Sequence, residues 1–299
     1  MKLAGCCSET KIWVKVLMWL CCMTLMTGVA LVLWGISPDH TSLTSLKILQ
    51  LLQSLFTFLL PPLMMAFLWS KQPMNWLHLN KGLTWQVVVL AIVLVLVSSP
   101  FINLLSYCNQ QMTLPDFLAP LEAWMQQQEE TAASLTERFL QADSILGVLG
   151  NLCLMALLPA MGEELSFRGV LQGLFTRRDS KVSAQIAIWA TAIIFSAIHC
   201  QFYGFVPRML LGALFGYALY WSGSLWLPIV MHFTNNALAV VMYQVSEKAQ
   251  WDSATLETFG TGETLWVGIL SMLLVAVGVY LLRRSLTMSN ASSRISSGN

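Results

Sequence analysis

The sequence predicts an all-α membrane protein, a polytopic bundle of about eight transmembrane helices with both ends of the chain in the cytoplasm. Three observations support this prediction. Hydrophobic residues make up 56% of the chain and charged residues only 10%, against about 25% charged residues in a typical soluble domain. Uncharged apolar stretches of about 20 residues, the length of a membrane-spanning helix, recur along the chain. Lysine and arginine gather in alternate connections between these stretches.

Each predicted span is an apolar stretch without acidic or basic side chains other than histidine. The spans cover residues 16–36, 48–69, 83–107, 145–161, 182–198, 209–221, 225–245 and 265–282. The sixth is short, and only the tight turn Ser222-Gly223-Ser224 separates it from the seventh, so the two could form one long element. Lys11 and Lys15 precede the first span as in a signal peptide. The apolar stretch is long, however, and no small-residue cleavage site follows it, which favours a retained anchor.

The charge of the connections predicts their orientation. Basic residues lie before the first span, in alternate connections and after the last span: Lys2, Lys11, Lys15, Lys71, Lys81, Arg177, Arg178, Lys181, Arg283, Arg284 and Arg294. Connections 108–144 and 246–264 are acidic instead. Because basic connections stay in the cytoplasm, this alternation predicts cytoplasmic termini and an even number of spans. The net charge of +1 gives no indication of a nucleic-acid partner.

Composition divides the chain into four regions. Residues 1–107 form an N-terminal three-helix membrane region, 108–144 an extracytoplasmic loop, 145–245 a core that carries the polar motifs described below, and 246–299 a loop, the last span and a tail. In the second region Phe117, Leu121, Trp124 and Met125 recur near helical spacing. They predict an amphipathic helix at the outer surface, either a solvated connector or a lid. The tail from Ser285 is rich in serine and asparagine and is predicted to be disordered.

Two adjacent glutamates follow the fourth span, where charges are costly and usually serve a function. Glu164 and Arg168 are four residues apart, so they share a helix face and are expected to pair. Glu163 lies about 100° away around the helix; it is left unpaired and is suited to act as a general base or acid. The apolar pattern continues to Thr176, which places both glutamates within the membrane. Alternatively, the two glutamates only cap the cytoplasmic end of the span.

Two later spans contribute histidine and asparagine. His199 closes the fifth span, while His232 and Asn236 share one face of the seventh. Histidine and asparagine are suitable donors to a developing oxyanion, although both also form ordinary hydrogen bonds between membrane helices. Because isolated polar groups in hydrocarbon are costly, we expect these three residues to meet Glu163 and Glu164 in one cavity.

The order of these motifs resembles a family of membrane proteases. Glu163-Glu164-x-x-x-Arg168, Phe195-x-x-x-His199 and His232-x-x-x-Asn236 resemble the CPBP family of CAAX prenyl endopeptidases of the Rce1 type and bacteriocin-processing or immunity (Abi) proteins. The resemblance covers about residues 145–245 and includes Gly212-x-x-x-Gly216. It implies that Glu163 and His199 activate a water molecule for attack on a peptide carbonyl. It also implies that His232 and Asn236 stabilise the oxyanion, with Glu164 held by Arg168.

The resemblance leaves metal dependence open, since members have been described both as metalloproteases and as glutamate-type proteases. The sequence contains no HExxH motif, but Glu163, His199 and His232 could together bind a zinc ion. That arrangement would leave only Glu164 as a separate base, and the spacing commits Glu164 to Arg168. Catalysis without a metal cofactor gives each motif residue its own task and is therefore the expectation.

The predicted function is that of an intramembrane endopeptidase. Its partners would be membrane lipid and a membrane-associated peptide or protein substrate, with no nucleic acid. Short loops and the absence of eukaryotic targeting signals indicate a bacterial cytoplasmic (inner) membrane. The alternative is a non-catalytic polytopic protein, namely a scaffold, an immunity factor or a proton-coupled transporter, because buried glutamates and histidines also relay protons. The inverted repeats and broken helices typical of transporters are not evident.

Overall fold

The computed structural model describes residues 3–37, 39–176, 181–251 and 258–296, and all regular structure in these ranges is helical. The α-helices are α1 (Ile12–Gly35), α2 (Leu43–Leu52), α3 (Leu60–Trp69), α4 (Pro73–Trp76), α5 (Trp85–Gln110), α6 (Ala119–Leu140), α7 (Ile145–Asn151), α8 (Leu158–Glu164), α9 (Gly173–Thr176), α10 (Lys181–Ala197), α11 (Phe205–Ser222), α12 (Trp226–Ala249) and α14 (Leu265–Ser296). Short 3₁₀ turns are η2 (Asp116–Leu118), η5 (Phe202–Gly204) and η6 (Gly262–Thr264). Three π-helical segments, η1 (Gln53–Leu59), η3 (Leu152–Leu157) and η4 (Leu165–Gln172), join α-helices end to end.

The helices account for all eight predicted spans, and the chain is an integral membrane protein. Within the described ranges, six helical segments are long and apolar enough to cross a membrane: Ile12–Gly35, Leu43–Trp69, Trp85–Gln110, Ile145–Thr176, Phe202–Ser222 and Gly262–Met288. The predicted fifth span contains a shorter apolar helix, Ala184–Ala197. The predicted seventh span is α12, whose apolar sequence is interrupted by polar residues near its middle. The sixth and seventh spans are separate helices, because Gly223 turns the chain with a left-handed φ of 64°.

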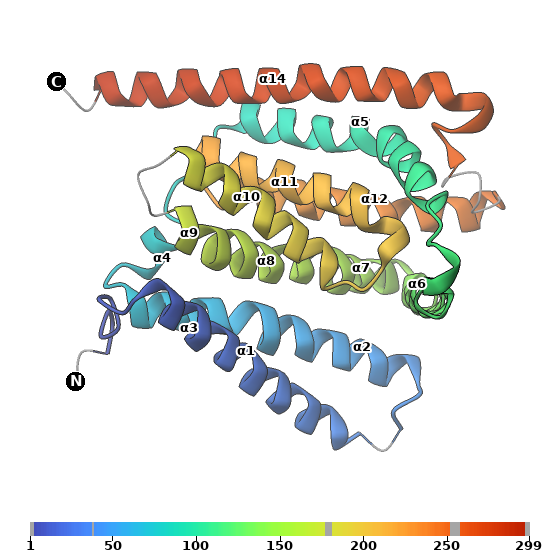
Figure 1. The fold of residues 1–299 in the computed structure, drawn as a ribbon, viewed down its shortest axis with the longest axis horizontal. Helices are drawn as coiled ribbons and strands as arrows, with labels where there is room; N and C mark the ends of the chain where they lie inside the picture. The colour runs from blue at the N-terminus through green and yellow to red at the C-terminus, as the bar shows by residue number, and fades with distance from the viewer. Residues whose placement is uncertain (1–2, 38, 177–180, 252–257, 297–299) are drawn as a thin grey trace.

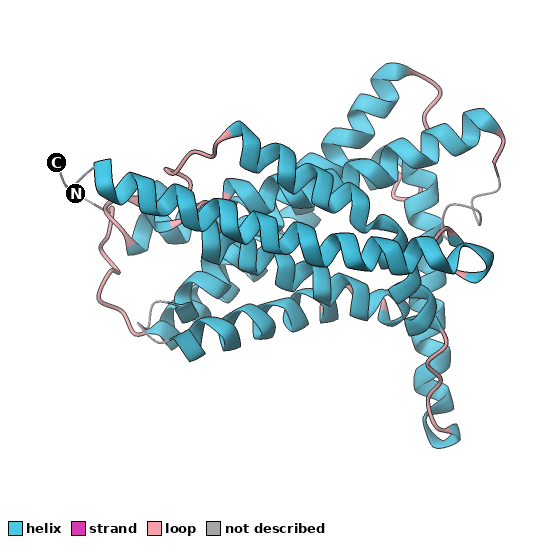
Figure 2. Ribbon diagram, turned by 90° about the horizontal axis from the view of Figure 1, so that it is seen from above, coloured by secondary structure: helices cyan, strands magenta, loops and turns pink. Residues whose placement is uncertain are grey.

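Most of the helices run side by side, whereas α6 crosses one end of the bundle at a steep angle (Figures 1 and 2). The first and last helices both have their chain-terminal ends at the opposite end of the bundle, on different sides of it (Figure 1). This arrangement agrees with an even number of crossings. The cytoplasmic location of that end stays a prediction from the loop charges, of which Lys2, Arg177 and Arg178 lie outside the described residues.

One boundary differs from the prediction. The α14 helix continues to Ser296, so the predicted end of regular structure at Leu282 is too early, and only residues 297–299 of the predicted disordered tail lie outside the described part. Extending an existing helix fixes one residue for each hydrogen bond gained, so a polar segment can continue what an apolar one has begun. In contrast, the helix with both glutamates continues to Thr176, as the apolar pattern predicts. Glu163 and Glu164 therefore lie well inside this 32-residue segment and do not cap its end.

Small residues allow the helices around the glutamates to pack closely. A side chain on Gly162 would place its Cβ 2.8 Å from the Cβ of Phe58, so α8 and η1 make near-backbone contact. A side chain on Gly216 would come within 2.7 Å of the amide oxygen of Gln172. Lipid tails are as apolar as leucine, so helix association in a membrane depends on such close packing and on hydrogen bonds.

Candidate active site

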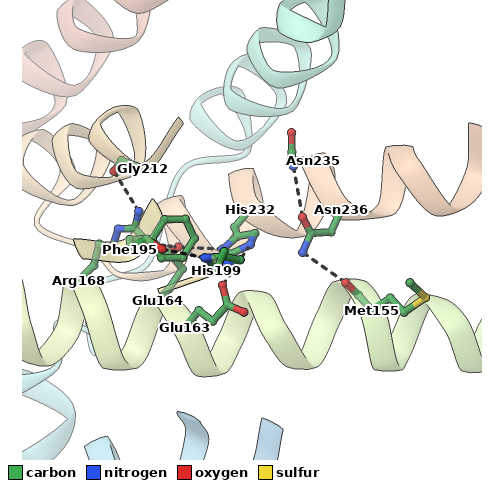
Figure 3. A network of polar contacts seen from close by, with 10 residues as sticks. All are labelled: Met155, Glu163, Glu164, Arg168, Phe195, His199, Gly212, His232, Asn235 and Asn236. Carbon is green, nitrogen blue, oxygen red and sulfur yellow. Dashed lines mark hydrogen bonds and ion pairs between the residues drawn. The ribbon is translucent and has the colours of Figure 1, made fainter. Parts of the chain in front are cut away.

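One helix supplies the two glutamates on different faces. Glu163 lines an open cavity, with its side chain 18% exposed, whereas the Glu164 side chain is fully buried. The two residues are neighbours in the sequence, and a helix turns about 100° per residue. The predicted division between a free and a paired carboxylate therefore follows directly from helix geometry, as the orientations in Figure 3 show.

Glu164 is the centre of a buried charge network. Its Oε1 lies 2.6 Å from Nη1 of Arg168, confirming the predicted pair. The same oxygen lies 2.8 Å from Nδ1 of His232, as expected from the prediction that these residues meet. Arg168 is also fully buried. A buried carboxylate is tolerated when it is paired and hydrogen-bonded, and Glu164 meets both conditions.

Helix α11 holds the far side of Arg168. Nη2 of Arg168 donates to the carbonyl oxygen of Gly212 at 3.0 Å, and one turn further on Nε2 of Gln172 donates to the carbonyl oxygen of Gly216, also at 3.0 Å. The guanidinium carbon lies 4.6 Å from the ring centre of Phe195, a cation–π distance. The Gly212-x-x-x-Gly216 motif thus exposes two backbone carbonyls to two polar side chains.

His232 connects the buried network to the cavity. Because an ionised carboxylate only accepts hydrogen bonds, Nδ1 of His232 carries the proton shared with Glu164. Its other nitrogen, Nε2, faces Glu163, 3.8 Å from Oε2. The ring is fixed further by stacking on Phe215, with ring centres 5.4 Å apart. His232 is therefore held in one orientation and directs Nε2 toward the free glutamate.

His199 is oriented in a comparable way by the backbone. It follows the end of α10, and its Nδ1 lies 2.7 Å from the carbonyl oxygen of Phe195, to which it donates. In the neutral ring this leaves Nε2 with a free lone pair. His199 and Glu163 line the same two cavities, so both side chains border one space despite the distance between them in the sequence.

Asn236 is placed by a proline on the facing helix. Pro159 has no N–H, so it cannot donate to the carbonyl oxygen of Met155, four residues before it. Nδ2 of Asn236 donates to that carbonyl at 3.3 Å, and its Oδ1 accepts from Nδ2 of Asn235 at 3.2 Å. Asn236 therefore forms the expected contact to the helix of the glutamates, and one amide hydrogen remains for a ligand.

These side chains border a cavity of about 420 Å³. Its lining includes Glu163, His199, His232, Asn235 and Asn236 together with the last turns of α6: Leu135, Thr136, Phe139 and Leu140. Glu163, His199, His232 and Asn236 thus line one cavity, as predicted. The prediction is wrong for Glu164, which does not line the cavity and lies buried with Arg168 behind His232, because the helix turns it to another face. The region predicted as an amphipathic loop forms part of the cavity wall.

The polar lining residues that were not identified from the sequence are Gln50, Thr136, Gln201, Arg208 and Asn235. Arg208 donates to the side chain of Gln201 at 2.7 Å. The predicted sixth span begins one residue after Arg208, whereas the membrane segment of the structure is Phe202–Ser222 and includes this arginine. A charged residue beside an apolar stretch usually has a function, so the position of Arg208 could have marked it as a candidate.

The described part of the chain contains no preformed metal site. No group of three histidine, cysteine, aspartate or glutamate side chains lies close enough together there to hold a metal ion. Glu163, His199 and His232 remain the residues that would hold a metal. The orientation of both rings through Nδ1 is also the arrangement found in metal-binding histidines.

Comparison with known proteins finds similarity in the same segment. Residues 145–238 match the family model described as type II CAAX prenyl endopeptidase Rce1-like. The uncharacterized protein YpbD of Bacillus subtilis (strain 168) is 29% identical over 92 residues, which cover 29% of this chain and 43% of that protein. The chain thus spans less than half the length of this curated relative. No solved structure matches significantly. Residues 145–238, which contain all six motif residues, are therefore similar to the Rce1-like CAAX prenyl endopeptidase family.

Proposed function

We propose that the chain is an intramembrane endopeptidase of a bacterial cytoplasmic membrane, which hydrolyses a peptide bond in a membrane-associated peptide or protein. One observation carries the proposal. Glu163 opens onto a cavity that His199, His232 and Asn236 also line, whereas the charge of the adjacent Glu164 is matched by Arg168. A free carboxylate beside oriented histidines is the arrangement that general-base hydrolysis requires.

The first step is the activation of water. A water molecule between Glu163 and Nε2 of His199 donates one hydrogen bond to each. Glu163 takes one proton as the water oxygen forms a bond to the peptide carbonyl carbon. The carbonyl π electrons move onto oxygen and give a tetrahedral intermediate. Collapse of this intermediate breaks the C–N bond, and the protonated carboxyl of Glu163 returns its proton to the leaving amine, so the carboxylate is regenerated.

The oxyanion of the intermediate needs two donors. Asn236 offers its remaining amide hydrogen. His232 can donate from Nε2 when the ring is protonated on both nitrogens, and Glu164 stabilises that cation through its bond to Nδ1, 2.8 Å away. The buried network thus acts on the reaction through His232. This assignment requires no metal; were one bound, Glu163, His199 and His232 would hold it and it would polarise the carbonyl or the water.

The test is a search for uncleaved precursors. Membranes of cells that produce the wild-type protein and the Glu163→Gln variant are compared by quantitative proteomics. Glutamine keeps the shape and hydrogen bonding of the side chain but removes the base, so precursor proteins should accumulate with the variant. Glu130→Gln, on the exposed surface of α6, is the matched control. A Glu163→Gln profile equal to wild type would support the scaffold alternative instead.

A further inference from the structure

A second cavity of about 210 Å³ reaches the proposed catalytic pair from another side. It is lined by Glu163 and His199, by Pro159 and Ile198, and by Gln50, Gln53, Ser54 and Phe58. The last four residues belong to α2 and η1, outside the segment that matches the protease family. The N-terminal membrane region therefore contributes directly to the surroundings of the site.

The two cavities differ in lining. The larger one has many apolar residues from α6, α11 and α12, including Leu135, Phe139, Leu211 and Val240. The smaller one adds two amides and a hydroxyl to the catalytic pair. Within the described part of the chain, the side chains of Gln50 and Gln53 have no hydrogen-bond partner. Amides without partners are costly in a membrane interior unless water satisfies them.

The smaller cavity has the properties of a water site. A buried water molecule needs a polar space with two to four partners, and its share of liquid volume is about 30 Å³. The cavity volume of about 210 Å³ holds several such molecules, and its lining supplies amide, hydroxyl, carboxylate and imidazole groups. Hydrolysis inside a membrane consumes water at a place that the surrounding hydrocarbon keeps dry.

We propose that the cavity of Gln50, Gln53 and Ser54 stores the hydrolytic water and delivers it to Glu163 and His199, while the peptide occupies the larger cavity. The proposal rests on the proposed protease function. Gln53 and Ser54 act as positioning residues for water, and because they line only the smaller cavity, the peptide does not contact them. Gln50 borders both cavities and lies at their boundary.

The first test measures water at the cavity independently of activity. Ser54→Cys is introduced into the full chain and reconstituted in phospholipid vesicles. A water-soluble methanethiosulfonate reagent is added, and mass spectrometry follows modification of the peptide that contains position 54. Only a thiolate reacts, and thiolates form in water. Cys21, exposed on the apolar helix α1, is the internal control. We expect the cysteine at position 54 to react at least tenfold faster than Cys21. If Ser54→Cys does not fold, Gln53→Cys replaces it and should react at a similar rate.

The second test measures the kinetics. Gln53→Leu should lower kcat at least fivefold with KM unchanged, and Gln53→Asn should restore part of the loss. Gln86→Leu, at an exposed position on α5, should leave both constants unchanged. A cysteine at position 54 as unreactive as Cys21, an unchanged kcat, or a raised KM would each overturn the water assignment. The labelling result is obtained equally on the Glu163→Gln background, so a failed water site and a failed protease function are distinguishable.

Discussion

Replacing Glu164 by glutamine tests the division of labour between the two glutamates. The change removes the charge that faces two buried donors, Nη1 of Arg168 at 2.6 Å and Nδ1 of His232 at 2.8 Å. Each hydrogen bond to a charged group contributes about 1.5–3 kcal/mol. Breaking a buried ion pair from one side costs about 3–5 kcal/mol. We therefore expect Glu164→Gln to lower the free energy of unfolding by about 3–5 kcal/mol and to reduce the folded yield.

Glu163→Gln is the matched comparison. Glu163 is partly exposed, and its ion-pair distance to Nε2 of His232 is 3.8 Å, beyond hydrogen-bond distance. The loss of stability should stay below about 1 kcal/mol, while cleavage is abolished. In Glu164→Gln the buried charge of Arg168 has no partner, and adding Arg168→Met removes that charge. The double variant should therefore lose less free energy of unfolding than the sum of the losses in the two single variants.

The measurement is reversible unfolding in mixed micelles, followed by tryptophan fluorescence as a denaturing detergent is titrated, together with the yield of folded protein after extraction. Cleavage is measured on the same preparations. Equal yields and equal loss of cleavage for Glu163→Gln and Glu164→Gln would refute the assignment of separate roles to the two carboxylates.

The packing and the cavity give three further predictions. Gly216→Ala should destabilise the protein by about 1–3 kcal/mol, because the added Cβ would lie 2.7 Å from the Gln172 amide oxygen and 2.9 Å from Ile188. Gly150→Ala is the control: a Cβ added there would have no atom within 4 Å, so the same unfolding titration should show no change in stability. Thr136→Trp should fill part of the cavity from the α6 side and lower cleavage at least tenfold at normal folded yield; unaltered cleavage would remove α6 from the substrate path. Purified protein should contain far less than one zinc ion per chain and should keep its activity with the chelator 1,10-phenanthroline. If it instead contained one zinc ion per chain, and cleavage were lost when the zinc was removed and restored when it was returned, Glu163, His199 and His232 would be zinc ligands.

The parts of this structure that depend on local spacing were predictable. Uncharged stretches predicted the membrane helices, and the four-residue interval predicted the bond between Glu164 and Arg168. Helical periodicity in region 108–144 predicted the helix that became α6. In each case the information lies within one or two helical turns, where side-chain positions follow from the geometry of the helix itself.

Contacts between distant segments could not be read in the same way. The bond between His232 and Glu164 joins positions 68 residues apart. Gln50 lines the site from α2, whose continuation η1 packs closely against α8 at Gly162. Arg208 was missed because it directly precedes the predicted start of the sixth span, although the membrane segment begins at Phe202. Such contacts depend on which helix faces which neighbour, and several helix arrangements bury the same apolar faces equally well.

The π-helical segments have a consequence for how this membrane core compares with others. A π turn closes hydrogen bonds between residues five apart, where an α turn spans four, so each such segment corresponds to an α-helix with an inserted residue. η3 and η4 flank α8 on either side, inside a helix that has no loop between Ile145 and Thr176. A homologue with plain α-helical turns there would align with a one-residue gap in the middle of a membrane helix. Deleting one residue from η3 would turn the glutamate pair by about 100° relative to the start of its helix. A one-residue insertion or deletion in these segments would therefore chiefly change the direction in which Glu163 and Glu164 point, with little effect on the length of the helix.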